Sequence, residues 1–539
     1  MTTISFSDTL YVNNDNELSY SFNNVDWTQI INYPITLMYT GSGTGNVYLT
    51  SDITFNTSTK YFIIGSANIT FDGGNKTVTI NNVTDYPGLF QNGTGDEYVS
   101  YTNGYSNVTI KNIIMECSTS TLSTSNGWFA QSYFSNAATN NILENLSSNG
   151  PIGEGEISDS HSGGISGSYT AVNNGNLEIK NCHSTGDMIG RFSSGICGNN
   201  AGMNYGTVNI SNCYSSGNMI SDLNISHSKG GICGSDAGHS GGNVNITNCY
   251  STGNINSGYS GGICAQSAGN LNGSVIITNC YSTGIISGSH SGGIAGIWFG
   301  MYSNNCSIIN CYTRGNVTGT EAGGICGSSI GWTDTTDYSP HILISNCYFN
   351  GEISENCGSI LGGHDDRYSY LTSQVTVDIT NCYAVNGPFV SPLILSGINF
   401  NYTNSGFSSG TWNDITASTY LSNAPTYSST GSLLKQGSIW LDPDSNSLNV
   451  PFVFNTDLIG LETDVETSST ITTNHCQSLK SLYNLGHHTK THFSMILGNS
   501  RGKKGSQSRI FSHMNKIGKG DHYKNHLIES MGIKRLCYK

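Results

Sequence analysis

Apolar and polar residues alternate in short runs along most of the chain, which is the pattern of half-buried β-strands. In residues 243–253 (NVNITNCYSTG), Val244 and Ile246 alternate with polar residues. The same alternation returns in residues 206–217 and 377–387. Gly and Asn separate the runs, and both residues tolerate the positive φ angles that sharp corners require. Because no helical spacing of apolar residues occurs in this region, the sequence predicts an all-β protein.

These runs belong to a repeat. The sequence Asn-Cys followed by an aromatic ring recurs seven times, and the steps between its cysteines are 31, 36, 31, 31, 36 and 35 residues. An Ile that follows a small residue recurs at nearly the same intervals. Units of this size cannot bury an apolar face alone, but a stack of them can. We therefore predict a right-handed parallel β-helix (a solenoid) in which equivalent residues form rows and the extra residues of longer units form loops. The two markers are Cys182, Cys213, Cys249, Cys280, Cys311, Cys347 and Cys382, and Ile165, Ile196, Ile232, Ile263, Ile294, Ile325 and Ile360.

A β-propeller is the main alternative at this period. It would need four antiparallel strands per blade and about 40 residues or more. The units here contain only two or three short strands, which favours the solenoid. We expect an N-terminal cap with irregular coils in residues 1–160, the repeat array in 161–385, closing coils and a cap in 386–460, and a poorly ordered basic tail in 461–539. Caps are expected because an open terminal coil exposes apolar core and an unpaired strand edge.

The repeat resembles a known family. Residues 230–265 contain Gly-Gly-Ile-Cys-Gly, then VNITNCYSTGNI, then a second Gly-Gly-Ile-Cys. This order resembles the GLUG-type repeat over roughly residues 160–385, and residues 437–454 are similar to the closing stretch that often follows such arrays. The resemblance implies a pectin-lyase-like β-helix in large surface or adhesin-type proteins, without general catalytic residues to carry over. The chain departs from the family by placing cysteines where an aliphatic residue is usual, at Cys197, Cys233, Cys264 and Cys326.

The composition indicates surfaces that are polar but largely uncharged. Only 10% of residues are charged, while Gly alone contributes 67, so neutral amides and hydroxyls must supply the solvated faces. Stacked rows favour this composition, because like charges would otherwise lie opposite each other. The high Asn content also resembles repeat proteins of giant DNA viruses, which would imply a virion or host-cytoplasm location.

Charge divides the chain into two parts. Residues 1–469 carry 9 Lys and Arg against 33 Asp and Glu, and residues 470–539 carry 12 against 2. The basic tail could contact nucleic acid or another polyanion weakly, but a solvated, disordered extension is the interpretation we prefer.

The chain start and the cysteines indicate the folding compartment. The N-terminus lacks the basic and apolar segments of a signal peptide, and no apolar run approaches the roughly 18–20 residues of a membrane span. We therefore expect folding in the cytosol, with the 16 Cys mostly present as free thiols that act as small core residues. No Cys-x-x-Cys pair occurs, and stacked cysteines lack tetrahedral geometry, so we predict neither a metal nor a cofactor.

One local cluster could support catalysis. Enzymes on β-helices usually cleave polysaccharides with carboxylates and a basic group on one exposed face. Asp365, Asp366 and Arg367 follow a Gly-Gly pair and are the best candidates. Neighbouring residues in a strand point to opposite faces, so the two carboxylates would not converge without a bend. We interpret the cluster as a polar loop and keep a polysaccharide hydrolase or lyase as the alternative.

The leading hypothesis is a non-enzymatic structural or adhesin-like protein that presents polar faces to glycans or other proteins. A virion component and a homo-oligomer are both compatible with such a rod. The predicted binding surface is an exposed row of tyrosine rings, on which sugars or partner side chains could stack. These tyrosines are Tyr214, Tyr250, Tyr281, Tyr312 and Tyr348.

Overall fold

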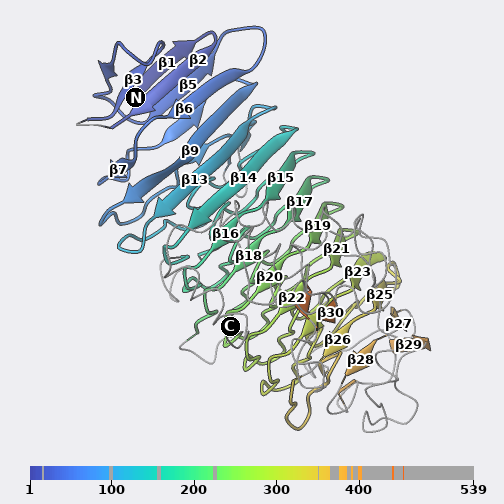
Figure 1. Ribbon diagram of the computed structural model, residues 1–539. Helices are drawn as coiled ribbons and strands as arrows, with labels where there is room; N and C mark the ends of the chain where they lie inside the picture. Colours follow the sequence, from blue (N-terminus) through green and yellow to red (C-terminus); the bar gives the residue numbers. More distant parts are fainter. Residues whose placement is uncertain are drawn as a thin grey trace, which may run out of the picture. The chain divides into compact units, whose positions relative to one another are not determined.

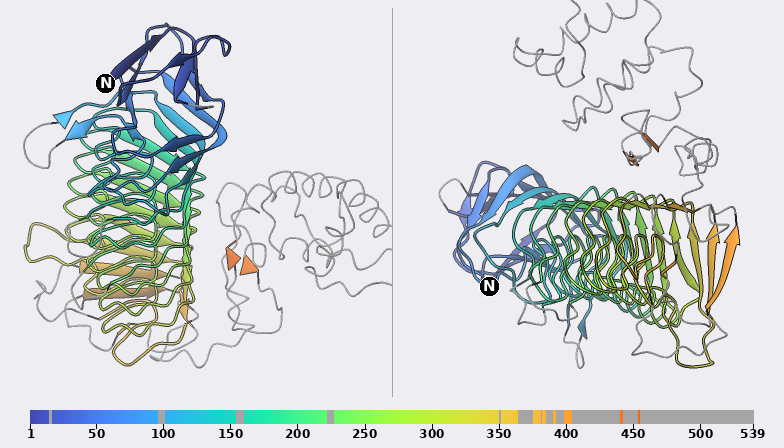
Figure 2. Two further views of the ribbon diagram at one scale, coloured as in Figure 1. Left: turned by 90° about the vertical axis from the view of Figure 1, so that its left-hand side faces the viewer. Right: turned by 90° about the horizontal axis from the view of Figure 1, so that it is seen from below.

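The computed structural model (Figures 1 and 2) describes residues 1–14, 17–95, 101–153, 160–221, 227–349, 351–363, 375–380, 382–384, 390–391, 398–403, 440–441 and 453–454. The chain forms two compact units, Met1–Asn423 and Ala424–Lys539. Every regular element in the described ranges is a β-strand, which confirms the all-β prediction. Among these residues no helix has the length and apolarity that crossing a membrane requires.

The first unit is a parallel β-solenoid, as predicted. Each long strand pairs in parallel with the equivalent strand of the coil before it and of the coil after it, so the backbone ladder runs along the stack (Figure 1). The long sheet consists of β2 (Thr9–Asn13), β6 (Gly45–Leu49), β9 (Ile69–Ile80), β13 (Thr109–Glu116), β14 (Asn141–Ser148), β15 (Asn176–Lys180), β17 (Thr207–Ser211), β19 (Asn243–Thr247), β21 (Ser274–Thr278), β23 (Asn305–Ile309), β25 (His341–Ser345), β27 (Val375–Thr380) and β29 (Ile398–Thr403).

A row of shorter strands, which belongs to the same sheet, begins one corner later in each coil of the array. Val208 pairs with Val244 and Val244 with Val275, so identical repeat positions lie above one another. Coils of 31 and of 36 residues keep the same register, and the added residues therefore do not shift the ladder. The short strands are β16 (His183–Ser184), β18 (Tyr214–Ser215), β20 (Tyr250–Ser251), β22 (Tyr281–Ser282), β24 (Tyr312–Thr313), β26 (Tyr348–Phe349) and β28 (Tyr383–Ala384).

The first coils carry additional strands. β3 (Ser19–Ser21) and β4 (Thr28–Gln29) form a hairpin, and β3 pairs antiparallel with β2. β6 pairs with the other side of β2, so the first long strand is not an open edge of the sheet. In the second unit, two short strands pair antiparallel. The predicted basic tail 461–539 lies outside the described residues. The remaining strands are β1 (Thr2–Phe6), β5 (Ile35–Tyr39), β7 (Ile53–Phe55), β8 (Phe62–Ile64), β10 (Phe90–Gln91), β11 (Thr94–Gly95), β12 (Tyr101–Thr102), β30 (Trp440–Leu441) and β31 (Val453–Phe454).

The core consists of stacked rows. Val, Ile and Cys side chains that alternate with polar residues along the strands are fully or almost fully buried. All described cysteines are buried free thiols. Cys213 Sγ accepts a hydrogen bond from the Cys182 backbone N–H at 3.4 Å, which links the thiol row to the backbone of the neighbouring coil.

An asparagine row forms the corner between the long and short strands. These residues have φ between 53° and 58°, a left-handed conformation that Asn tolerates better than most residues. From Asn212 onward, each side-chain amide donates to the amide oxygen one coil earlier, for example Asn279 Nδ2 to Asn248 Oδ1 at 3.1 Å. The corner therefore explains why Asn precedes Cys in the six repeats whose Asn the structure describes. The row contains Asn181, Asn212, Asn248, Asn279, Asn310 and Asn346.

Candidate functional site

On another side of the coils, one turn position is occupied by a left-handed residue in coil after coil. The backbone N–H of this residue donates a hydrogen bond to a carbonyl of the next coil. Tyr169 N donates to Asn199 O at 2.8 Å, and Asn200 N donates to Ser235 O at 2.9 Å. Left-handed φ costs a residue other than glycine about 1–2 kcal/mol, so bulky side chains are unusual there. Strained positions that persist frequently serve function. This turn row consists of Tyr133, Tyr169, Asn200, Asp236, Ser267, Trp298 and Ser329, with φ between 55° and 60°.

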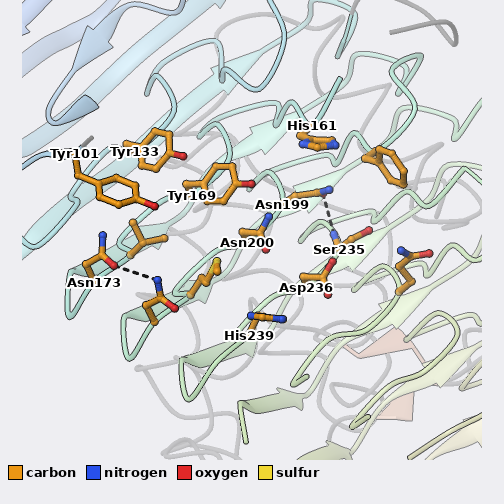
Figure 3. Close-up of a pocket in the computed structure, with 15 residues that line it drawn as sticks. Tyr101, Tyr133, His161, Tyr169, Asn173, Asn199, Asn200, Ser235, Asp236 and His239 are labelled. Carbon is orange, nitrogen blue, oxygen red and sulfur yellow. Dashed lines mark hydrogen bonds between the residues drawn. The ribbon is translucent and has the colours of Figure 1, made fainter. Parts of the chain in front are cut away.

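A groove lies over the first half of this row (Figure 3). Its volume of about 390 Å³ falls in the range of ~300–1,000 Å³ that is usual for small-molecule sites. Figure 3 shows three tyrosines at one end, and Asp236 and His239 toward the other. The lining residues are Tyr101, Tyr133, His161, Tyr169, Val172, Asn173, Phe192, Asn199, Asn200, Met203, Asn204, Ser235, Asp236, His239 and Gln266.

The tyrosine end forms an aromatic platform. The rings of Tyr133 and Tyr169 stack with centroids 4.8 Å apart and planes 4° apart. Tyr101 leans on Tyr133 at 5.6 Å, and His161 meets Phe192 edge-on at 5.0 Å. Tyr133 is buried whereas Tyr169 is half-buried, so the platform is anchored in the coil and open on the groove side.

Side-chain amides border the platform. Asn204 Nδ2 donates to Asn173 Oδ1 at 3.2 Å, so the amides of neighbouring coils hold each other in place. Asn199 Oδ1 accepts the Ser235 backbone N–H at 2.9 Å. Amides fixed in this way present donors and acceptors in defined directions, which suits a ligand rich in hydroxyl groups.

The groove carries little charge. Asp236 is the one carboxylic acid among its described lining residues, and none of these residues is Lys or Arg. Burial raises the pKa of Asp236 to about 6, while a hydrogen bond from the Asn270 side chain opposes the rise. Burial also lowers the pKa of His239, whose Nδ1 lies 2.7 Å from Ser240 Oγ. The carboxyl group therefore titrates close to neutral pH and the imidazole favours its neutral form.

The predicted tyrosine row forms a ladder along the short strands. The rings stack from coil to coil at 4.9 Å, 4.7 Å and 5.0 Å, from Tyr214 through Tyr250 and Tyr281 to Tyr312. Our expectation of an exposed row is wrong for Tyr312 and Tyr348, which are buried, and the other three are half-buried. Neighbouring rings occupy the faces of Tyr250 and Tyr281, so these two rings offer edges rather than faces. A binding role for this row stays a prediction.

The predicted catalytic residues Asp365, Asp366 and Arg367 fall outside the described residues, so the hypothesis of a cleavage site there also stays a prediction. Where the structure describes side chains, no group of three or more His, Cys, Asp and Glu residues is arranged to hold a metal ion.

The groove could not be predicted from the residues that recur. The groove residues occupy repeat positions whose identity changes between coils, such as Tyr169, Asn200 and Asp236. The usable signal was a bulky or charged residue at a turn position where other coils carry Asn or Ser.

No protein-family model and no curated protein matches the chain. The likeness to GLUG-type repeats therefore rests on the sequence motifs alone.

Proposed function

We propose that this protein is a non-enzymatic, adhesin-like solenoid that binds a glycan chain in the groove over the turn row. The observation that carries the proposal is the stacked pair Tyr133 and Tyr169 beside the fixed amides of Asn173 and Asn204. Sugar rings have an apolar face that packs on aromatic rings, and hydroxyl groups that pair with amides. Both kinds of contact occur together in this groove.

The turn row runs along the stack with one residue in each coil, which favours a polymer over a single sugar. Coils lie about 4.8 Å apart, which is close to the length of one pyranose unit. An extended glycan that runs along the solenoid would therefore meet one member of the row per sugar, in the order Tyr169, Asn200, Asp236. A protein partner would instead cover a broader patch, of the order of 800 Å² on each side.

A polysaccharide hydrolase or lyase remains the second candidate. The pKa of Asp236, raised to about 6, suits a general acid and is the observation in its favour. Glycoside hydrolysis normally uses two carboxyl groups about 5–9.5 Å apart, whereas the described lining supplies one. Release of reducing ends or unsaturated products, lost in Asp236→Asn or in Asp366→Ala, would establish the enzyme and overturn the binding proposal.

The direct test is titration of the full chain with oligosaccharides selected on a glycan array. Tyr169→Ala should weaken binding about tenfold or more, because it removes the open ring of the platform. Tyr250→Ala is the matched control, since it removes a half-buried, stacked tyrosine of the predicted row. Loss of binding in Tyr250→Ala alone would move the site to the tyrosine row, and absence of any glycan binding would end the proposal.

We also propose a virion surface as the location, on the basis of polar faces and the compositional likeness to viral repeat proteins. Mass spectrometry of purified particles should detect the chain. Particles that contain none of it would contradict this location without affecting the groove.

A further inference from the structure

We propose that the glycan bound in the groove carries free amino groups, and that Asp236 pairs with one of its ammonium groups. This inference rests on the proposed function and names the ligand class for the same site. Its starting point is the presence of a carboxylate at a turn-row position that neutral residues fill in the adjacent coils.

The backbone alone does not require an acid at this position. Asp236 has φ 55°, its N–H donates to Gln266 O at 3.1 Å, and its carbonyl accepts from His239 N at 3.2 Å. Asn200 and Ser267 adopt the same conformation one coil before and one coil after. An asparagine would therefore satisfy the turn, and the negative charge is the property that Asp236 adds.

That charge has no counter-charge among the described residues. Burial and the Asn270 side chain account for the pKa of Asp236, without an attractive basic group. By contrast, Asp72 lies 3.3 Å from Lys111, and Asp378 lies 2.6 Å from His341. Asp236 is half-buried, and a carboxylate that has lost part of its water shell is stabilised when a cation pairs with it. A ligand ammonium would supply the missing partner.

The surroundings favour a cationic ligand as well. The Tyr169 ring can attract an ammonium group through a cation–π interaction, whereas the Phe192 ring already has the Arg191 guanidinium over it at 5.0 Å. Residues 1–469 carry 33 Asp and Glu against 9 Lys and Arg, so this part of the chain attracts polycations and repels uronic or sulfated glycans. The groove therefore fits a hexosamine polymer better than a neutral or an acidic one.

The experiment compares three β-1,4-linked oligosaccharides of equal length by calorimetry with the full chain at about pH 6. The probes are oligomers of glucosamine, N-acetylglucosamine and glucose. We expect the glucosamine oligomer to bind at least tenfold more tightly than the glucose oligomer. Asp236→Asn should reduce this ratio to about one, because the variant retains the shape and removes the charge.

Asp85→Asn is the matched control. Asp85 is exposed, also has a left-handed φ of 54°, and does not line the groove. The variant makes the same change in net charge and should keep the preference for the amino sugar. Thermal unfolding of both variants should show that each is folded.

The outcomes separate this inference from the proposed function. Equal or tighter binding of the neutral or N-acetylated oligomer, or an unchanged preference in Asp236→Asn, would overturn the amino-sugar inference and leave glycan binding in place. Absence of binding by all three oligomers and by every glycan on the array would overturn both.

Discussion

At the scale of single residues, the solenoid uses one backbone conformation for two purposes. Left-handed residues at the Asn corner hold neighbouring coils together through their amides. Left-handed residues of the turn row instead include Tyr169 and Trp298, which are poorly suited to that conformation, and the charged Asp236. The first set stabilises the stack, whereas the second set gives individual coils different chemistry.

The Asn corner predicts a clear stability effect. Asn279→Ala should lower the free energy of unfolding by about 2–4 kcal/mol, because it breaks two amide hydrogen bonds and places alanine at φ 58°. Asn279→Gly loses the same hydrogen bonds but tolerates the angle, so it should lie between Ala and wild type. Urea unfolding followed by circular dichroism measures both, and equal losses would show that the backbone angle contributes nothing.

Asp236 predicts a dependence of stability on pH. Its folded-state pKa of about 6 exceeds the ordinary value of 3.8, so the folded state binds the proton more tightly than the unfolded chain does. Its contribution is therefore most favourable below about pH 4, declines as pH rises to about 6, and stays low above that. Asp236→Asn should gain up to about 3 kcal/mol at neutral pH relative to wild type and lose this advantage near pH 4. Thermal unfolding of both proteins across this range measures the difference, and a constant difference would contradict the prediction.

At the scale of the coil, contact between neighbours depends on the Gly-Gly segment. A β-carbon at Gly231 would lie 2.0 Å from the carbonyl oxygen of Gly262 and 2.6 Å from the Ser251 side chain. A β-carbon at Gly262 would meet the Gly293 carbonyl in the same way, at 2.1 Å. At these two glycines the backbones therefore approach too closely for a side chain, which explains why glycine precedes the marker Ile in all but the Ile360 coil.

Gly231→Ala should consequently destabilise the protein by more than about 3 kcal/mol, because a backbone atom rather than a flexible side chain obstructs the new methyl group. Gly258→Ala is the matched control in the next coil. Its β-carbon would meet Ser289 Oγ at 3.1 Å and the Ser289 carbonyl oxygen at 3.4 Å, which small shifts can relieve. Chemical denaturation compares the two variants, and similar effects would refute the close-approach explanation.

The sequence predicted what the coils share. The constant step between Cys213 and its counterparts, together with the alternation of Val244 and Ile246, required stacked strands with one buried face. The burial of Tyr312 could not be predicted, because alternation assigns a residue to a face without indicating what packs over that face. The groove could not be predicted for a related reason. Tyr169 and Asp236 differ from their counterparts in other coils, and only the fold aligns them.

At the scale of the whole first unit, the thiol rows are sealed inside the stack. Every described cysteine is buried, and burial raises the pKa of Cys306 to about 11 and that of Cys117 to about 12. Limited access slows alkylation of every described thiol, and a low thiolate fraction adds to this effect at Cys306 and Cys117. These thiols therefore act as core side chains.

Iodoacetamide should accordingly leave the described cysteines unmodified in the native protein and label all of them in denaturant. Peptide mass spectrometry gives the result cysteine by cysteine. Rapid native labelling at Cys249 or Cys280, in the middle of the array, would contradict a closed stack.

Because every interface in the array has the same register, a coil can be duplicated or deleted by recombination without creating a new kind of junction. The length of the rod is thus a variable that evolution can change in single-coil steps. The aromatic and acidic turn residues would move with their coils, so each such event would also change the spacing between ligand contacts. A solenoid of identical interfaces thereby allows recognition sites to be moved along the stack during evolution without loss of the fold.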